Sequence, residues 1–169
     1  YILEDSIYVH PKAKPEWHAV VEVYSENRLT YFSDNYVGYL KKAELEKYIY
    51  ELVKPTYGDC KVYTQPWGFS LDDSFNKDTD IMTYVSNSDY TTYILTDKKA
   101  ENIEEDFRKV CDTFLDKNLQ GDKLYVLYVT KEDLGKFEEY RMDYVFNKCN
   151  YYYRISRLYD NVDKIWLDD

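Results

Sequence analysis

Residues 90–129 read YTTYILTDKKAENIEEDFRKVCDTFLDKNLQGDKLYVLYV, and this stretch indicates the fold class most clearly. It opens and closes with runs of aromatic and β-branched residues, 90–95 and 123–129, which are typical of buried strands. Between these runs, from about 97 to 117, apolar residues recur at helical spacing; they are Ile103, Phe107, Val110, Cys111, Phe114 and Leu115. The Gly-Asp pair at 121–122 favours a turn. The stretch therefore predicts a strand, an amphipathic helix and a second strand.

The same order can be traced earlier in the chain, at an offset of 62 residues (107 − 45). The apolar pairs that this offset superposes are Leu45 with Phe107, Tyr48 with Val110, Ile49 with Cys111, Leu52 with Phe114 and Val53 with Leu115. We expect Pro55 to end the earlier helix, because proline lacks a backbone N–H. The strands expected around that helix are 17–24, 29–32, 36–40 and 61–65. We therefore predict two strand–strand–helix–strand units, 17–65 and 81–129, the second opening with strands over 81–86 and 90–95.

The remaining segments are a loop and a C-terminal extension. Residues 66–80 predict a loop, because proline, glycine and several aspartates interrupt the apolar pattern. Residues 130–169 predict a helix that begins at a capping-box sequence, followed by a strand over 151–158. Residues 1–15 show no pattern that we can assign. We expect one α+β domain over 1–169, with a largely antiparallel sheet and two or three helices packed mainly on one face.

The net charge of the chain indicates which classes of partner it can bind. The 169 residues include 22 Lys and Arg against 32 Asp and Glu, which gives a formal charge of −10. Such acidity repels nucleic-acid phosphates and anionic lipids, so direct binding to nucleic acid or a membrane is not expected. A partner with a basic surface is favoured instead. The chain also holds 21 Tyr residues, whose rings with a polar tip are enriched at protein interfaces.

Acidic residues gather on the outer side of the second predicted helix and near the C-terminus. The candidate partner-binding residues are Glu101, Glu104, Glu105, Asp112, Asp116, Asp160 and Asp163. Carboxylates that project from a rigid helix imitate a row of phosphates and attract a basic groove. We therefore favour a non-enzymatic interaction protein that binds a basic protein partner. An inhibitor of a nucleic-acid-handling enzyme, of the phage or mobile-element type, is one form of such a protein.

Aromatic residues suggest an alternative function, a small-ligand or carbohydrate binding module. Trp67 and Phe69 lie in the aromatic turn of the predicted loop, and Tyr152 and Arg154 fall on one face of the predicted C-terminal strand. Such side chains stack on a base, a nucleotide or a sugar. Binding of this kind would depend little on salt, unlike binding by charge.

A carboxylate- or metal-dependent enzyme is the remaining alternative. Asp72, Asp78 and Asp80 are weak candidates for metal ligands, because alternating oxygen-bearing residues could surround a calcium ion. The positions at which a calcium-binding loop needs glycine and an acid hold Lys77 and Thr83. No nucleophile elbow, phosphate-binding loop or zinc-protease motif is present, so we assign no catalytic residue and expect no cofactor.

The three cysteines, Cys60, Cys111 and Cys149, bear on the compartment of the protein. An odd number without a CxxC pair favours neither a zinc site nor a secreted disulfide scaffold. We therefore expect a reducing compartment, the cytoplasm of a bacterial or an infected host cell. We expect Cys111 to be a small core residue, because it falls on the apolar stripe of a helix.

Overall fold

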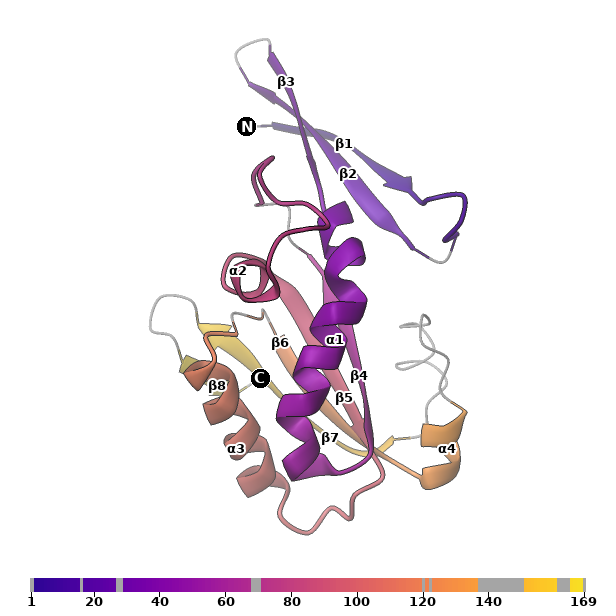
Figure 1. Cartoon of the computed structure of the whole chain (residues 1–169), viewed down its shortest axis with the longest axis vertical. Coiled ribbons are helices and arrows are strands. Elements are labelled where there is room, and N and C mark those ends of the chain that lie inside the picture. The colour runs from indigo at the N-terminus through magenta and orange to yellow at the C-terminus, as the bar shows by residue number, and fades with distance from the viewer. Residues whose placement is uncertain are drawn as a thin grey trace.

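The computed structural model describes residues 2–15, 17–26, 29–67, 71–119, 121, 123–136, 151–160 and 165–168, with the backbone alone for 2–4, 26, 29, 31, 151–160 and 165–168. The described strands form two sheets (Figure 1). Sheet A is an antiparallel meander of β1 (Ile2–Val9), β2 (Ala19–Glu26) and β3 (Leu29–Asp34). Sheet B has the order β4-β5-β6-β7-β8, and its only parallel pair is β5 with β6. The strands of sheet B are β4 (Cys60–Pro66), β5 (Tyr90–Thr96), β6 (Lys123–Val129), β7 (Tyr151–Asp160) and β8 (Ile165–Asp168).

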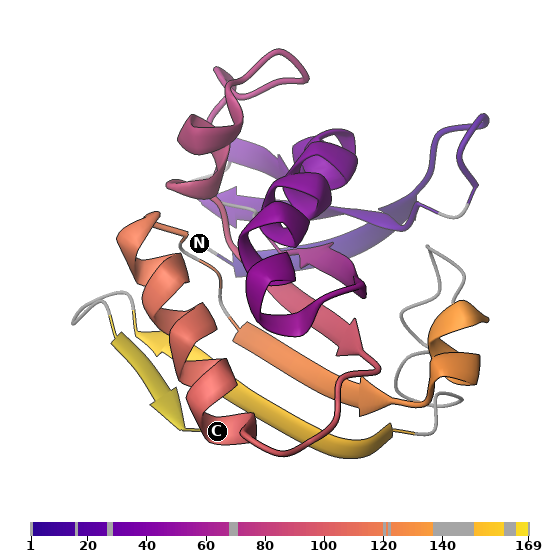
Figure 2. The ribbon, with the colours of Figure 1, turned by 60° about the horizontal axis from the view of Figure 1, so that its bottom comes forward.

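The helices of the described part are α1 (Tyr36–Tyr57), α2 (Ile81–Val85), α3 (Ile103–Asp116) and α4 (Lys131–Gly135). Figure 2 shows α1 and α3 lying along the same face of sheet B. The core on that face is one cluster that includes Ile49 of α1, Val85 of α2, Phe107 of α3 and Ile94 of β5. Leu134 of α4 belongs to a second cluster on the opposite face of the sheet. The α+β class, with helices packed mainly on one face, is therefore confirmed.

The first half of α1 corrects the expected strand over 36–40. The buried side of this helix includes Lys42 and Glu46 between apolar positions, and these charged residues hide the helical period in the sequence. The close approach of α1 to Pro66 of β4 also requires a glycine at position 38, because a Cβ there would lie 2.2 Å from Cβ of Pro66. A sequence pattern that counts only apolar residues therefore misses the beginning of this helix.

Pro55 does not end α1, contrary to expectation. It lies inside the last turn, and the helix continues to Tyr57. Gly58 follows with φ of 69°, a conformation that glycine adopts without strain, and its N–H donates to the carbonyl of Lys54 at 2.8 Å. The glycine rather than the proline therefore determines where the helix ends.

The expected strand over 81–86 is also wrong, because α2 occupies this segment. The carboxylate of Asp80 accepts hydrogen bonds from the N–H groups of Met82 and Thr83, at 3.0 and 3.1 Å. Such an N-terminal cap starts a helical turn that a short alternating pattern does not show. The second predicted unit thus has the order α2-β5-α3-β6. Its strands are neighbours in sheet B, whereas β3 and β4 lie in different sheets.

Side chains of α1 cover the free edge of β4. Strand β4 pairs only with β5 and is therefore an edge strand of sheet B. The N–H of Thr64 donates to the Glu46 carboxylate at 2.7 Å, and the Lys42 ammonium donates both to that carboxylate and to the Thr64 carbonyl. All three residues are buried. An edge strand that is covered in this way offers no backbone groups for pairing with another chain at this point.

Hydrogen bonds of Asn35 and Tyr39 join sheet A to the rest of the protein. The buried Asn35 accepts a hydrogen bond from the N–H of Val20 at 2.8 Å and donates one to the carbonyl of Pro66 at 3.2 Å. Tyr39 adds a hydrogen bond from its hydroxyl to the carbonyl of His18, at 2.8 Å. Sheet A therefore lies at the N-terminal end of α1, displaced from the sheet B core (Figure 1). In the described part of the chain, no helix combines the length and apolar character needed to cross a bilayer.

Candidate functional site

The acidic candidates on α3 lie on its outer side. Five of the predicted partner-binding residues are exposed at the start or along the solvent side of this helix: Glu101, Glu104, Glu105, Asp112 and Asp116. They are interleaved with exposed Arg108, Lys109 and Lys117, and Lys109 forms an ion pair with Glu105 at 2.7 Å. This ion pair lowers the pKa of Glu105 through its hydrogen bond and its charge. The outer side of α3 is thus of mixed charge. Asp160 lies in β7, and Asp163 is outside the described residues.

The structure does not bring the aromatic ligand-binding candidates together. Trp67 is exposed and donates from its indole N–H to the Thr91 hydroxyl at 2.8 Å, beside the beginning of β5. That end of β5 is level with Lys123, the first residue of β6. Tyr152 and Arg154 lie on β7, where the register places them near the other end of β6. Phe69 is outside the described residues. One aromatic patch built from Trp67 and Tyr152 is therefore ruled out by the register.

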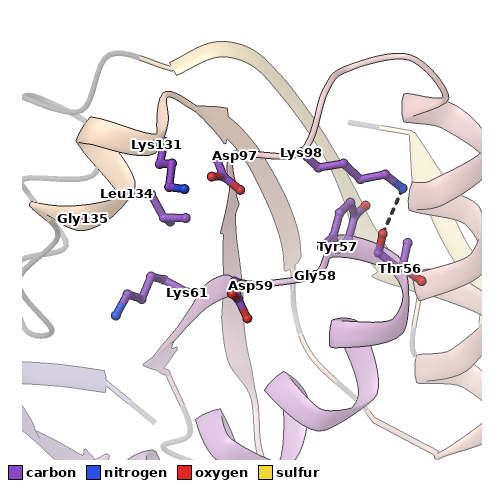
Figure 3. Close-up of a pocket in the computed structure, with 10 residues that line it drawn as sticks. All are labelled: Thr56, Tyr57, Gly58, Asp59, Lys61, Asp97, Lys98, Lys131, Leu134 and Gly135. Carbon is purple, nitrogen blue, oxygen red and sulfur yellow. Dashed lines mark hydrogen bonds between the residues drawn. The ribbon is translucent and has the colours of Figure 1, made fainter.

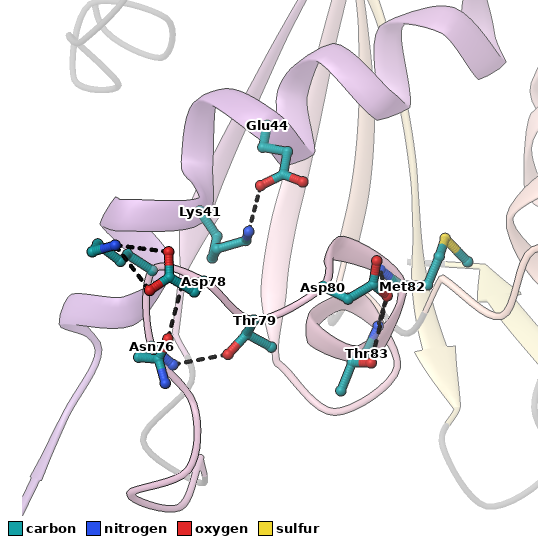
Figure 4. A network of polar contacts seen from close by, with 9 residues as sticks. Lys41, Glu44, Asn76, Asp78, Thr79, Asp80, Met82 and Thr83 are labelled. Atoms are coloured by element: carbon teal, nitrogen blue, oxygen red, sulfur yellow. Dashed lines mark hydrogen bonds and ion pairs between the residues drawn. The ribbon is translucent and has the colours of Figure 1, made fainter.

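The three candidate metal ligands are engaged in local hydrogen bonds instead. Asp80 caps α2, and Asp78 pairs with Lys77 at 2.7 Å (Figure 4). Asp72 accepts a hydrogen bond from the N–H of Ser74 at 2.8 Å. The hydrogen bonds from Ser74 lower the pKa of Asp72. Among the residues that the structure describes, no group of three or more potential ligands is placed to hold a metal ion.

Cys60 and Cys111 are buried cysteines outside any disulfide bond, and burial raises the pKa of Cys60 to about 12. Because the thiolate is the reactive form, we expect neither thiol to react with Ellman's reagent in the folded protein at about pH 8. The measurement uses a Cys149→Ser variant, so that only these two thiols are counted. Reactivity should stay flat between about pH 7 and pH 9 and reach two equivalents only after denaturation. Rapid labelling of a native thiol would contradict this prediction.

Sheet A is the surface that the sequence did not indicate. Ala19 is its only fully buried residue among those whose side chains are described, whereas every residue of β5 is buried. Tyr8 and Phe32 are 74% and 71% exposed, and Ile7 is 49% exposed. Residues 2–9 show no alternation of apolar and polar residues; the β-branched and aromatic run Ile7-Tyr8-Val9, before the His10-Pro11 pair, is the signal that could have revealed β1.

The pairing register places an apolar patch with acidic corners on one face of sheet A. Ile7 pairs with Val21 and Val21 with Asp34, while Asp5 pairs with Val23 and Val23 with Phe32. Since alternate residues of a strand share a face, these two rows lie on the same side. We call this side the Ile7 face; it consists of Asp5, Ile7, Val21, Val23, Phe32 and Asp34. Its two carboxylates stand at opposite edges of the sheet, with the apolar residues between them.

A cavity of about 610 Å³ lies at the other end of the molecule (Figure 3). It is bounded by the end of α1, the beginning of β4, the segment after β5, and α4. Its lining consists of Thr56, Tyr57, Gly58, Asp59, Lys61, Asp97, Lys98, Lys131, Leu134 and Gly135. Tyr57 is buried with its ring edge-on to Tyr128, at 6.3 Å between centroids, and burial raises the pKa of Tyr57 above its usual range.

Comparisons with known proteins add little to these observations. No family model matches the chain, and no curated protein matches it. A solved structure that resembles it is described as a DUF5037 family protein from Ruminococcus gnavus ATCC 29149. That likeness covers 96% of this chain and 86% of that chain, at 13% sequence identity and a TM-score of 0.49. These values establish no family for this chain, so its function has to be inferred from its own surfaces.

Proposed function

We propose that the chain is a non-enzymatic interaction protein that binds a basic protein partner, and that sheet A is its docking surface. The observation that carries this proposal is the Ile7 face, an apolar sheet surface on which Ile7 and Phe32 remain 49% and 71% exposed. A stable domain normally buries the apolar side of a sheet against another element. Large apolar side chains that remain exposed together mark an interaction site.

Charge complementarity specifies the partner. The three strands of sheet A contain Glu4, Asp5, Glu22, Glu26 and Asp34, and they contain no Lys, Arg or His. Lys12 and Lys14 are exposed in the connection between β1 and β2, beyond the end of these strands. The Ile7 face therefore fits a surface with apolar side chains flanked by Lys or Arg. Complementary potentials of this kind speed association and select the partner.

Sheet A supports this function better than α3 does. The acids of α3 alternate with Arg108, Lys109 and Lys117, whereas the strands of sheet A carry acids alone. Sheet A also supplies apolar area, which the exposed side of α3 lacks. Enzymes that handle nucleic acids present basic surfaces, so the proposal includes an inhibitor that occupies a nucleic-acid site.

The test combines affinity capture with matched variants. One test variant removes the charges of the Ile7 face (Asp5→Asn with Asp34→Asn), and another removes its apolar centre (Ile7→Ser with Phe32→Ser). The controls are Glu51→Gln with Asp73→Asn and Leu40→Ser with Met82→Ser, because these residues are exposed on other elements. A captured protein is identified by mass spectrometry, purified and titrated against each variant at low and high salt.

We expect a basic protein that binds the wild type and the controls equally. The apolar test variant should weaken its affinity roughly tenfold, and the charge variant should weaken it and reduce its dependence on salt. Circular dichroism of each variant excludes unfolding as the cause. Equal binding to the test variants and controls, or the absence of any basic partner, would overturn the proposal.

A further inference from the structure

The cavity at the end of sheet B lies where mixed α/β sheets bind small molecules. Strands β5 and β6 are parallel and are connected through α3, and the cavity opens beyond their carboxyl ends. Ligands of open α/β sheets bind in this position, since the loops that follow neighbouring strands diverge there. A volume of about 610 Å³ is in the usual range for a small-molecule site.

Charged groups of both signs surround this cavity without neutralising one another. Lys98 is already engaged, because it pairs with Asp106 at 2.5 Å and donates to the carbonyl of Thr56 at 2.9 Å. The other charges are the ammonium groups of Lys61 and Lys131 and the carboxylates of Asp59 and Asp97. Within the described part of the chain, the structure records no hydrogen bond or ion pair for these four side chains.

Figure 3 shows how the charges are arranged. Lys131 of α4 and Asp97, just after β5, point toward one another, yet they form no ion pair within 4.0 Å among the described contacts. Leu134 is 8% exposed and is an apolar residue of the cavity wall, whereas Tyr57 is only 2% exposed and belongs to the cluster on the other face of sheet B. Gly58 and Gly135 leave open space, because a Cβ at either position would have no neighbour within 4 Å.

These features together select one class of ligand. A simple anion would be repelled by Asp59 and Asp97, and a metal ion would be repelled by the lysines. An uncharged ligand would form no ion pair with these groups, of which Asp59, Lys61 and Lys131 are exposed. A zwitterion with an apolar body satisfies both signs and covers the apolar part of the cavity.

We propose that this cavity binds a short peptide with free termini, of dipeptide size and with apolar side chains. Its carboxylate binds the ammonium group of Lys131, and its amino group binds the carboxylate of Asp97. Lys61 and Asp59 line the opposite side of the cavity, and Leu134 contacts an apolar side chain of the peptide. An extended dipeptide spans about 7 Å, so it covers more of the cavity than a single amino acid does. This site is separate from the docking surface on sheet A.

The test is a titration of the ¹⁵N-labelled full chain with leucyl-leucine, followed by NMR. Three related probes isolate each contact: the N-acetylated dipeptide lacks the positive charge, the C-terminal amide lacks the negative charge, and inorganic phosphate reports anion binding alone. We expect saturable shifts of the Gly58 and Gly135 amides with leucyl-leucine. Each capped form should bind about tenfold more weakly, which is the usual value of a charge-assisted contact.

Matched variants complete the experiment. Lys131→Gln and Asp97→Asn should each weaken binding about tenfold. Lys47→Gln and Glu51→Gln, which alter exposed charges on α1, should leave it unchanged. The sheet A variants should also bind leucyl-leucine normally, so failure of one proposal is distinguishable from failure of the other. The absence of saturable shifts, equal binding of the capped forms, or binding of phosphate alone would overturn the inference.

Discussion

Replacing Lys42 with alanine should lower the free energy of unfolding by about 3–5 kcal/mol, which is the usual cost of breaking a buried ion pair. Lys42 and Glu46 are each 7% exposed. Without the ammonium group, the Glu46 carboxylate remains buried with the Thr64 N–H, and the Thr64 carbonyl loses its donor. The measurement is urea denaturation followed by circular dichroism.

A second variant on the same helix provides the control. Lys47→Ala removes an exposed lysine from α1, and we expect it to change stability by less than about 0.5 kcal/mol. The double variant Lys42→Ala with Glu46→Ala should lose less stability than the two single variants lose in sum, because the two residues share one network. Equal losses of stability for Lys42→Ala and Lys47→Ala would show that the network contributes nothing, and strict additivity would show that Lys42 and Glu46 do not act together.

The same ion pair explains why part of the fold escaped prediction. Residues 45–53 carry a visible apolar stripe, and the structure confirms a helix there. Toward the N-terminus the buried side continues with Lys42 and Gly38, neither of which counts as apolar. These residues are buried because they meet β4, through Thr64 and Pro66, and that contact joins elements far apart in sequence. Local spacing cannot show it.

The stretch 90–129 was predicted more completely, because there the local sequence pattern matches the burial of the residues. Strand β5 is buried along its whole length, β6 is buried except at Lys123 and Tyr125, and α3 has a strongly amphipathic pattern. Local composition and tertiary environment therefore agree. The helix is shorter than expected, since it begins at Ile103 and residues 97–102 connect it to β5. This connection supplies Asp97 and Lys98 to the cavity.

The candidate sites were harder to predict than the fold, because their residues meet only in the tertiary structure. The acids of α3 were correctly expected to be exposed, because they lie opposite an apolar stripe. The Ile7 face arises only when Ile7, Val21 and Phe32 are aligned by strand register. The cavity likewise draws its residues from α1, β4, α4 and the connection after β5, and no spacing in the sequence relates Lys131 to Asp97.

Replacing Phe107 with alanine should also lower the free energy of unfolding by about 3–5 kcal/mol, because it removes a large buried ring and leaves a cavity. Phe107 is 0% exposed and lies in the cluster that joins α3 to α1 and sheet B, where Ile49 and Leu124 are also fully buried. The loss approaches the total stability of an ordinary domain. It is measured by urea denaturation at a temperature where the variant still folds.

Two further variants distinguish cavity formation from a general effect of substitution in α3. Arg108→Ala alters the exposed neighbour of Phe107 and should change stability by less than about 0.5 kcal/mol. Phe107→Leu keeps most of the buried volume, so its loss of unfolding free energy should lie between the losses of Arg108→Ala and Phe107→Ala. If Phe107→Ala costs less than about 1 kcal/mol, the packing of α3 on sheet B is not what holds this fold together. A large loss confined to Phe107→Ala, with the dependence on urea unchanged, would show that α3, α1 and sheet B unfold as one unit.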